Sequence, residues 1–227
     1  MGKFDRLSVP AGRSSEKSGR QLPVTYIPPM SRQRQHGFTL YELLITLLVV
    51  GIVLTLGIPN LSDFTRNGRI TGTANDLHSS FMVARSEAAR AKTNVTICAS
   101  SDPMGAALCD GASFEEGWVV FVDVDGDIQR ADVGADIEYL LRRHPPAHEI
   151  ITINTDGATF FSFAANGLGR GAVGGANPID SAMICDERGI EVAGGGSSAA
   201  RRLVVTPVGR SVVIRDNDLI AGSGDAC

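Results

Sequence analysis

The chain has 227 residues, of which 43% are hydrophobic and 26 are glycine, so it is too apolar for a disordered chain and too polar for a protein with several membrane spans. Its net charge of −4 excludes a histone-like polycation that binds nucleic acid along its whole length. The charge is unevenly placed: residues 1–37 hold seven basic and two acidic side chains, and residues 38–227 hold fourteen basic and twenty-three acidic ones.

The first segment is basic, is interrupted by Pro and Gly, and has no apolar period, which predicts that residues 1–36 are unstructured. We interpret residues 1–37 as a leader peptide. Met30 lies inside it, and a chain that starts there would keep a short basic leader ahead of Phe38. Both starting points, Met1 and Met30, stay open at this stage.

Residues 38–58 form an apolar run with a single charged residue, Glu42. As a helix the run spans about 32 Å, close to the roughly 30 Å of a hydrocarbon core. The basic flank, Arg32 and Arg34, lies on its N-terminal side, so the positive-inside rule places the N-terminus in the cytoplasm. The run predicts one transmembrane helix segment in contact with membrane lipid, with everything after residue 60 outside.

Residues 59–92 predict an amphipathic helix, because apolar residues recur mostly at spacings of three and four with charged residues between them. The expected apolar stripe consists of Leu61, Phe64, Ile70, Ala74, Leu77, Phe81, Ala84, Ala88 and Ala91. Pro59 removes a backbone donor and predicts a kink where the chain leaves the membrane. Together, residues 38–92 predict one long, bent helix.

After Lys92 the hydrophobic period changes from 3.6 to 2, which predicts a β domain over residues 93–227. The expected strands are 94–99, 117–123, 149–154, 158–164, 182–186, 202–208 and 211–215. Two glycine-rich stretches, 167–175 and 193–198, predict loops. The fold class is therefore α+β: a long N-terminal helix, transmembrane and then amphipathic, packed on a C-terminal antiparallel β domain.

All four cysteines lie on the predicted outer side of the membrane, where disulfides form readily. Their order along the chain suggests the pairs Cys98–Cys109 and Cys185–Cys227, and the two other pairings stay open. A zinc site is the competing interpretation. Since the chain has no CxxC motif and its histidines lie elsewhere, we predict no metal site.

The segment from Gly37 to Leu44 reads Gly-Phe-Thr-Leu-Tyr-Glu-Leu-Leu and resembles the processing site of type IV prepilins and pseudopilins. The resemblance implies that a prepilin peptidase/N-methyltransferase cuts between Gly37 and Phe38 and methylates the new amine of Phe38. It also implies that Glu42 pairs with such an amine on a neighbouring subunit. Pro59 stands where this class has its helix-kinking proline.

The rest of the chain resembles the GspH/FimT family, through the Ala/Arg/Ser-rich helix end at 84–90 and the runs 95–98, 117–123, 163–167 and 208–210. The resemblance implies a minor pilin or pseudopilin, without enzymatic activity or cofactor, that helps to start filament assembly beside other such subunits. It implies a bacterial inner-membrane protein with a periplasmic domain, which then enters a type IV pilus or a type II secretion filament. Trp118 would be a core anchor.

The alternative function is DNA binding by a minor pilin during natural transformation. Some members of this family bind DNA through a Gly-Arg-x-Arg motif, and this chain has Gly209-Arg210-Ser211-Val212, with Arg215 three residues later. In a strand, Arg210 and Arg215 would lie on opposite faces, and the acidic domain opposes phosphate binding. Both arginines stay as candidate DNA-binding residues.

Two other patterns point to chemistry only weakly. The segment Asp123–Asp127 resembles the start of a calcium loop, but an EF-hand needs Gly at the sixth position and Glu at the twelfth, where this chain has Ile128 and Gly134. We interpret it as an exposed hairpin turn after a buried strand, and an adventitious calcium site stays open as the alternative. His144 and His148 flank two prolines, and we interpret them as surface-loop residues, so the sequence predicts no catalytic residue.

Overall fold

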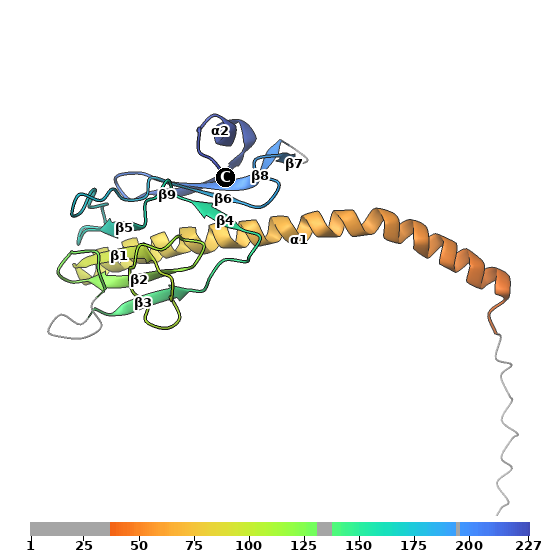
Figure 1. The fold of residues 1–227 in the computed structure, drawn as a ribbon, viewed down its shortest axis with the longest axis horizontal. Helices are drawn as coiled ribbons and strands as arrows, with labels where there is room; N and C mark the ends of the chain where they lie inside the picture. The colour runs from red at the N-terminus through yellow and green to blue at the C-terminus, as the bar shows by residue number, and fades with distance from the viewer. Residues whose placement is uncertain (1–36, 131–137, 194–195) are drawn as a thin grey trace, which may run out of the picture. The chain divides into compact units, whose positions relative to one another are not determined.

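The computed structural model describes residues 37–130, 138–193 and 196–227 and divides the chain into two units, residues 1–48 and 49–227. The leader predicted over residues 1–36 lies outside the described residues. Helix α1 (Leu40–Ala91) begins in the first unit and continues through the second (Figure 1). In the described part of the chain, no helix is both long enough and apolar enough to cross a membrane.

Helix α1 is continuous through Pro59, and the predicted kink there stays a prediction. The large apolar side chains between Phe38 and Leu54 are all exposed. Burial begins later in the helix, at Ile70.

The predicted apolar stripe is buried in its central part and exposed at its ends. Six of its members are buried: Ile70, Ala74, Leu77, Phe81, Ala84 and Ala88. Leu61 and Phe64 are 66% and 75% exposed, and Ala91 is exposed as well. The reason is that the β domain covers the helix only over this central stretch, which helical periodicity cannot reveal.

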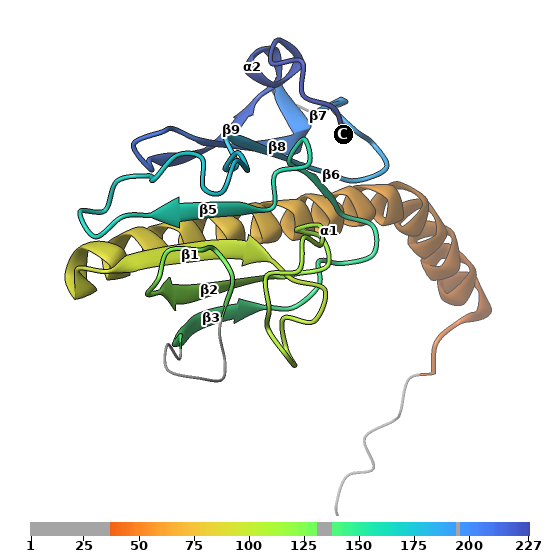
Figure 2. The same ribbon diagram turned by 60° about the vertical axis from the view of Figure 1, so that its left-hand side comes forward.

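The first antiparallel sheet has the strand order β3-β2-β1-β5. Its strands are β1 (Asn94–Ala99), β2 (Trp118–Asp123), β3 (Leu140–His144) and β5 (Phe160–Phe163). β1 is central, because Val95 pairs with Val122 on one side and with Phe163 on the other. Figure 2 shows this sheet lying along α1.

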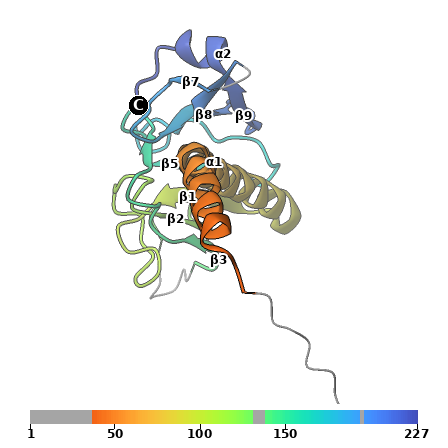
Figure 3. The same cartoon turned by 90° about the vertical axis from the view of Figure 1, so that its right-hand side faces the viewer.

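The second antiparallel sheet has the order β4-β6-β8-β7, with β9 also paired to β8. Its strands are β4 (Thr152–Asn154), β6 (Ser181–Cys185), β7 (Val192–Ala193), β8 (Ser197–Val205) and β9 (Ser211–Asp216), followed by the short helix α2 (Asn217–Ala221). Within the second unit, α1 has β1–β3 on one side and β7–β9 on another (Figure 3).

One hydrophobic core joins the helix to both sheets. Phe81 of α1 packs against Phe161 and Phe163, with ring centroids 5.5 and 6.5 Å apart. Trp118 is fully buried and donates its indole N–H to the Ser80 hydroxyl at 2.9 Å. The prediction that Trp118 anchors the core is confirmed.

The sequence interpretation missed three elements, β3, β7 and α2. The β3 sequence, Leu-Leu-Arg-Arg-His, shows no alternation of apolar and polar residues, and the strand forms because β2 pairs with it. β8 begins at Ser197, inside the stretch predicted as a loop over 193–198, because the pairings with β7 and β9 extend that far. α2 is a single short turn capped by Asp216, which accepts from the Asp218 and Leu219 amides.

Candidate functional site

The first turn of α1 is closed by a reciprocal pair of hydrogen bonds between Thr39 and Glu42. The Glu42 amide donates to the Thr39 hydroxyl oxygen at 3.2 Å, and the Thr39 amide donates to Glu42 Oε2 at 2.9 Å. The Thr39 hydroxyl also donates to this oxygen, at 3.0 Å. This is a capping box, which satisfies amide groups that a helix start leaves without partners. The sequence interpretation missed it, although the Thr-x-x-Glu spacing is its signature.

The peptide bond between Gly37 and Phe38 precedes the helix. Gly37 is exposed, and the Phe38 side chain is 88% exposed. Phe38 is therefore four residues from the only charged side chain of the apolar run, Glu42. Their roles in processing and assembly stay predictions.

The structure pairs Cys98 with Cys109 and Cys185 with Cys227, with Cα atoms 5.6 and 5.8 Å apart. This is the pairing that the chain order suggested. The first bridge connects β1 to the loop that follows it, and the second ties the C-terminal residue to β6. The described residues contain no free cysteine.

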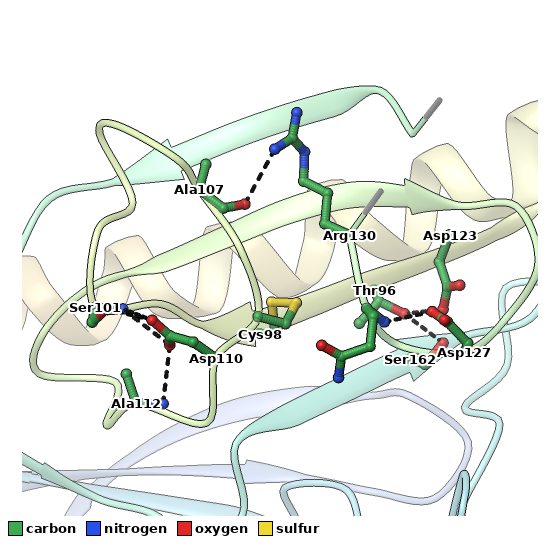
Figure 4. Close-up of a disulfide and its surroundings, with 12 residues drawn as sticks. Thr96, Cys98, Ser101, Ala107, Asp110, Ala112, Asp123, Asp127, Arg130 and Ser162 are labelled. Carbon is green, nitrogen blue, oxygen red and sulfur yellow. Dashed lines mark hydrogen bonds between the residues drawn. A yellow bond between two sulfur atoms is a disulfide. The ribbon is translucent and has the colours of Figure 1, made fainter. Parts of the chain in front are cut away.

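Asp110 organises the loop closed by the first bridge (Figure 4). Its carboxylate accepts from the Ser101 amide at 3.1 Å, from the Ser101 hydroxyl, and from the Ala112 amide at 3.2 Å. Burial raises the pKa of Asp110, but these hydrogen bonds outweigh it and the net shift is downward. The loop is thus held by a charged carboxylate next to the disulfide.

Two of the four C-terminal arginines contact other groups of the protein. Arg210 lies in the turn before β9 and Arg215 lies five residues later in that strand, and both are exposed. Arg201 is 7% exposed and donates to the carbonyl of Ser198 at 2.7 Å. Arg202 is paired with a carboxylate at 2.5 Å. The side chains of Arg201 and Arg202 are therefore already engaged, and DNA binding through Arg210 and Arg215 stays a prediction.

The surface-loop interpretation of His144 is wrong. His144 ends β3, and its ring stacks on Trp118 with centroids 3.6 Å apart and planes at 2°. Its Nε2 lies 3.4 Å from a carboxylate oxygen of Asp76 on α1. His148 is exposed. His144 was missed because strand pairing, and not local sequence, brings it to the tryptophan.

The end of β2 and the turn that follows it gather three carboxylates, from Asp123, Asp125 and Asp127. Each contributes an oxygen to a group in which all three lie within 4.8 Å of one another. Asp123 Oδ2 accepts from the Thr96 hydroxyl at 2.7 Å and from the Arg170 guanidinium at 3.1 Å. Among the described residues, this is the group with the ligand types and spacing that a metal ion needs.

Two protein-family models match the chain. The model for type II transport protein GspH matches residues 73–209, and the model for the prokaryotic N-terminal methylation motif matches residues 32–58. No curated protein matches the sequence.

The solved structures that are similar include two crystal forms of the type IV minor pilin FimU from Pseudomonas aeruginosa strain PAO1. The first is 18% identical, with a TM-score of 0.44, over 66% of this chain and 92% of FimU. The second is 18% identical, with a TM-score of 0.41, over 63% of this chain and 91% of FimU.

Proposed function

Since the chain belongs to the family of type II transport protein GspH, it is a structural subunit of the pilin and pseudopilin type, and we propose that it is a minor subunit that helps to initiate or cap a type IV pilus or a type II secretion filament. The observation that carries the proposal is the presence, in one chain, of the N-terminal methylation motif followed by a GspH domain. The other subunits of that filament are its expected partners.

The proposed processing step is cleavage between Gly37 and Phe38 by prepilin peptidase, with N-methylation of Phe38. The methylation motif spans this bond, and both residues are exposed ahead of the first helical residue, Leu40. Intact-mass and N-terminal peptide analysis of protein purified from host membranes tests the step. We expect a mature chain that begins with methylated Phe38. A chain that retains residues before Gly37, in a host with active peptidase, contradicts the proposal.

The proposed role of Glu42 is to pair with the α-amine of Phe38 on a neighbouring subunit. A carboxylate within a bilayer costs about 2.5–3.5 kcal/mol on insertion scales, and a cationic amine offsets that cost. The capping box provides a way to separate this role from helix capping. Gln also fits the third helical position of a capping box, so Glu42→Gln keeps the helix start and removes the charge.

The experiment compares filament assembly by the unchanged chain, by Glu42→Gln and by Thr39→Ala. We expect Glu42→Gln to be processed normally but to lose incorporation into filaments. Thr39→Ala keeps the charge and loses one half of the capping box, so it should retain most of its incorporation. If Glu42→Gln assembles as well as the unchanged chain, Glu42 acts in the helix cap and the pairing role is wrong.

The proposed location is the bacterial inner membrane before assembly, with the N-terminus in the cytoplasm and the β domain in the periplasm. The apolar run over 38–58 and its basic N-terminal flank support this orientation. The two disulfides also support it, because such bridges persist in oxidising compartments. Cysteine labelling in sealed inner-membrane vesicles from cells that lack the prepilin peptidase tests it: a Cys introduced before residue 37, which the peptidase would otherwise remove, should be reached only from the cytoplasmic face.

DNA uptake is the second candidate function, and the exposure of Arg210 and Arg215 is the observation in its favour. Binding of duplex DNA by the full chain, measured at several salt concentrations, tests it. Arg210→Ala and Arg215→Ala should each weaken binding and flatten its salt dependence if they contact phosphates. If the chain does not bind duplex DNA, or if neither substitution changes its affinity, DNA binding through these residues is excluded.

A further inference from the structure

The turn after β2 brings three acidic side chains to one place. Asp123 is the last residue of β2 and is fully buried, whereas Asp125 and Asp127 are exposed. Gly126, at φ +80°, adopts the left-handed conformation that lets the chain reverse between them. One oxygen from each carboxylate lies within 4.8 Å of the other two. Three negative charges at this separation repel one another unless a cation lies among them.

In the buried carboxylate of Asp123, hydrogen bonds within the described residues reach only one of the two oxygens. Asp123 Oδ2 accepts from Thr96 and Arg170. Asp123 Oδ1 is also buried, and among the described residues it has no hydrogen-bond partner. Figure 4 shows the Asp123 side chain directed toward the loop that carries Asp127. A buried carboxylate oxygen without a partner is costly, because its water has been removed and nothing replaces it.

The charge balance of the cluster matches a divalent cation. Arg170 donates to Asp123 Oδ2 at 3.1 Å and, through its other terminal nitrogen, to the Gly126 carbonyl at 2.8 Å. One guanidinium against three carboxylates leaves a charge of −2.

The chemistry of the donors selects among divalent cations. All three side chains offer carboxylate oxygen, the donor that hard cations prefer. Two of the three lie at the surface, where water can complete the coordination shell. Calcium accepts six to eight oxygens in irregular arrangements, whereas magnesium requires a near-ideal octahedron. A short turn with one buried and two exposed carboxylates therefore suits calcium, whose coordination geometry is less strict.

We propose that Asp123, Asp125 and Asp127 form a calcium-binding site at the end of β2. Asp123 Oδ1 supplies the buried ligand, and Asp125 and Asp127 close the site from the solvent side. The site is not an EF-hand, since the sequence lacks the Gly and Glu of that motif. With few protein ligands, its dissociation constant should fall in the range of about 10⁻⁴–10⁻³ M typical of extracellular calcium modules.

The test uses the full chain in detergent, stripped of metal and then supplied with calcium or magnesium. At about 10 mM calcium the melting temperature should rise by roughly 3–10 °C, which is the shift that this affinity range implies for a protein of this size. Calorimetric titration with calcium should show one saturable site. A melting temperature that calcium leaves unchanged, or that magnesium raises equally, overturns the proposal of a calcium site.

Two double variants test whether the calcium-dependent rise in melting temperature comes from this loop. Asp125→Asn with Asp127→Asn removes two exposed ligands without touching the core, and it should melt like the metal-free unchanged chain at every calcium concentration. Asp156→Asn with Asp218→Asn removes two exposed carboxylates outside the cluster, and it should keep the full calcium shift. If the first variant keeps the shift, calcium binds elsewhere and the assignment to this loop is wrong.

Discussion

Removing the Cys185–Cys227 disulfide should destabilise the protein more than removing the Cys98–Cys109 disulfide. The physical reason is that a cross-link restricts the unfolded chain, and the restriction grows with the length of the closed loop. The two bridges span sequence separations of 42 and 11 residues. The loop-closure relation gives about 4 kcal/mol for the longer loop and about 2.8 kcal/mol for the shorter one.

The two bridges form a matched comparison. Each joins one buried cysteine, Cys185 or Cys98, to one that is more exposed, Cys227 or Cys109. Replacing both members of a pair by Ala therefore removes a similar amount of buried sulfur in the two variants. The expected difference of about 1.2 kcal/mol then reports mainly the difference in loop length.

Urea unfolding of the full chain in detergent, followed by the fluorescence of the single tryptophan, measures both losses of stability. Trp118 is suitable because it is fully buried in the core. Reduction of the unchanged chain should reproduce the sum of the two losses. If the Cys98–Cys109 variant loses as much stability as the Cys185–Cys227 variant, loop closure in the unfolded chain is not what these bridges contribute.

Four further substitutions test the core and one buried ion pair. Phe81→Ala should cost about 3–5 kcal/mol in unfolding free energy, because it leaves a cavity against Phe161 and Phe163 of β5; Phe81→Leu should cost clearly less. Ser80→Ala removes the buried acceptor of the Trp118 indole N–H and should cost about 1–3 kcal/mol, with a shift of the tryptophan emission. Arg188→Gln leaves the buried carboxylate of Asp186 without its ion pair and should cost about 2 kcal/mol near neutral pH. Burial raises the pKa of Asp186, but its bonds to Arg188 lower it on balance. The Arg188→Gln deficit in urea unfolding should therefore shrink as the pH falls through the folded-state pKa of Asp186, and a deficit independent of pH would contradict that ion pair.

Local patterns predicted much of the fold. The stripe from Ile70 to Ala88 and the strands around Val95 and Trp118 were visible because helical and strand periodicities appear within a few residues of sequence. The processing segment was equally visible, since Gly37, Phe38 and Glu42 lie within six consecutive residues. The capping box at Thr39 was equally local and was overlooked.

The sequence alone therefore determined the α+β class, the helix stripe, most strands and the resemblance of the N-terminal segment. The tertiary structure decided what depends on residues far apart in the chain. It paired His144 with Trp118 through β3, buried Arg201 and, among the described residues, left Asp123 Oδ1 without a hydrogen-bond partner. These outcomes follow from strand pairing and burial, which are set by contacts that no local pattern records.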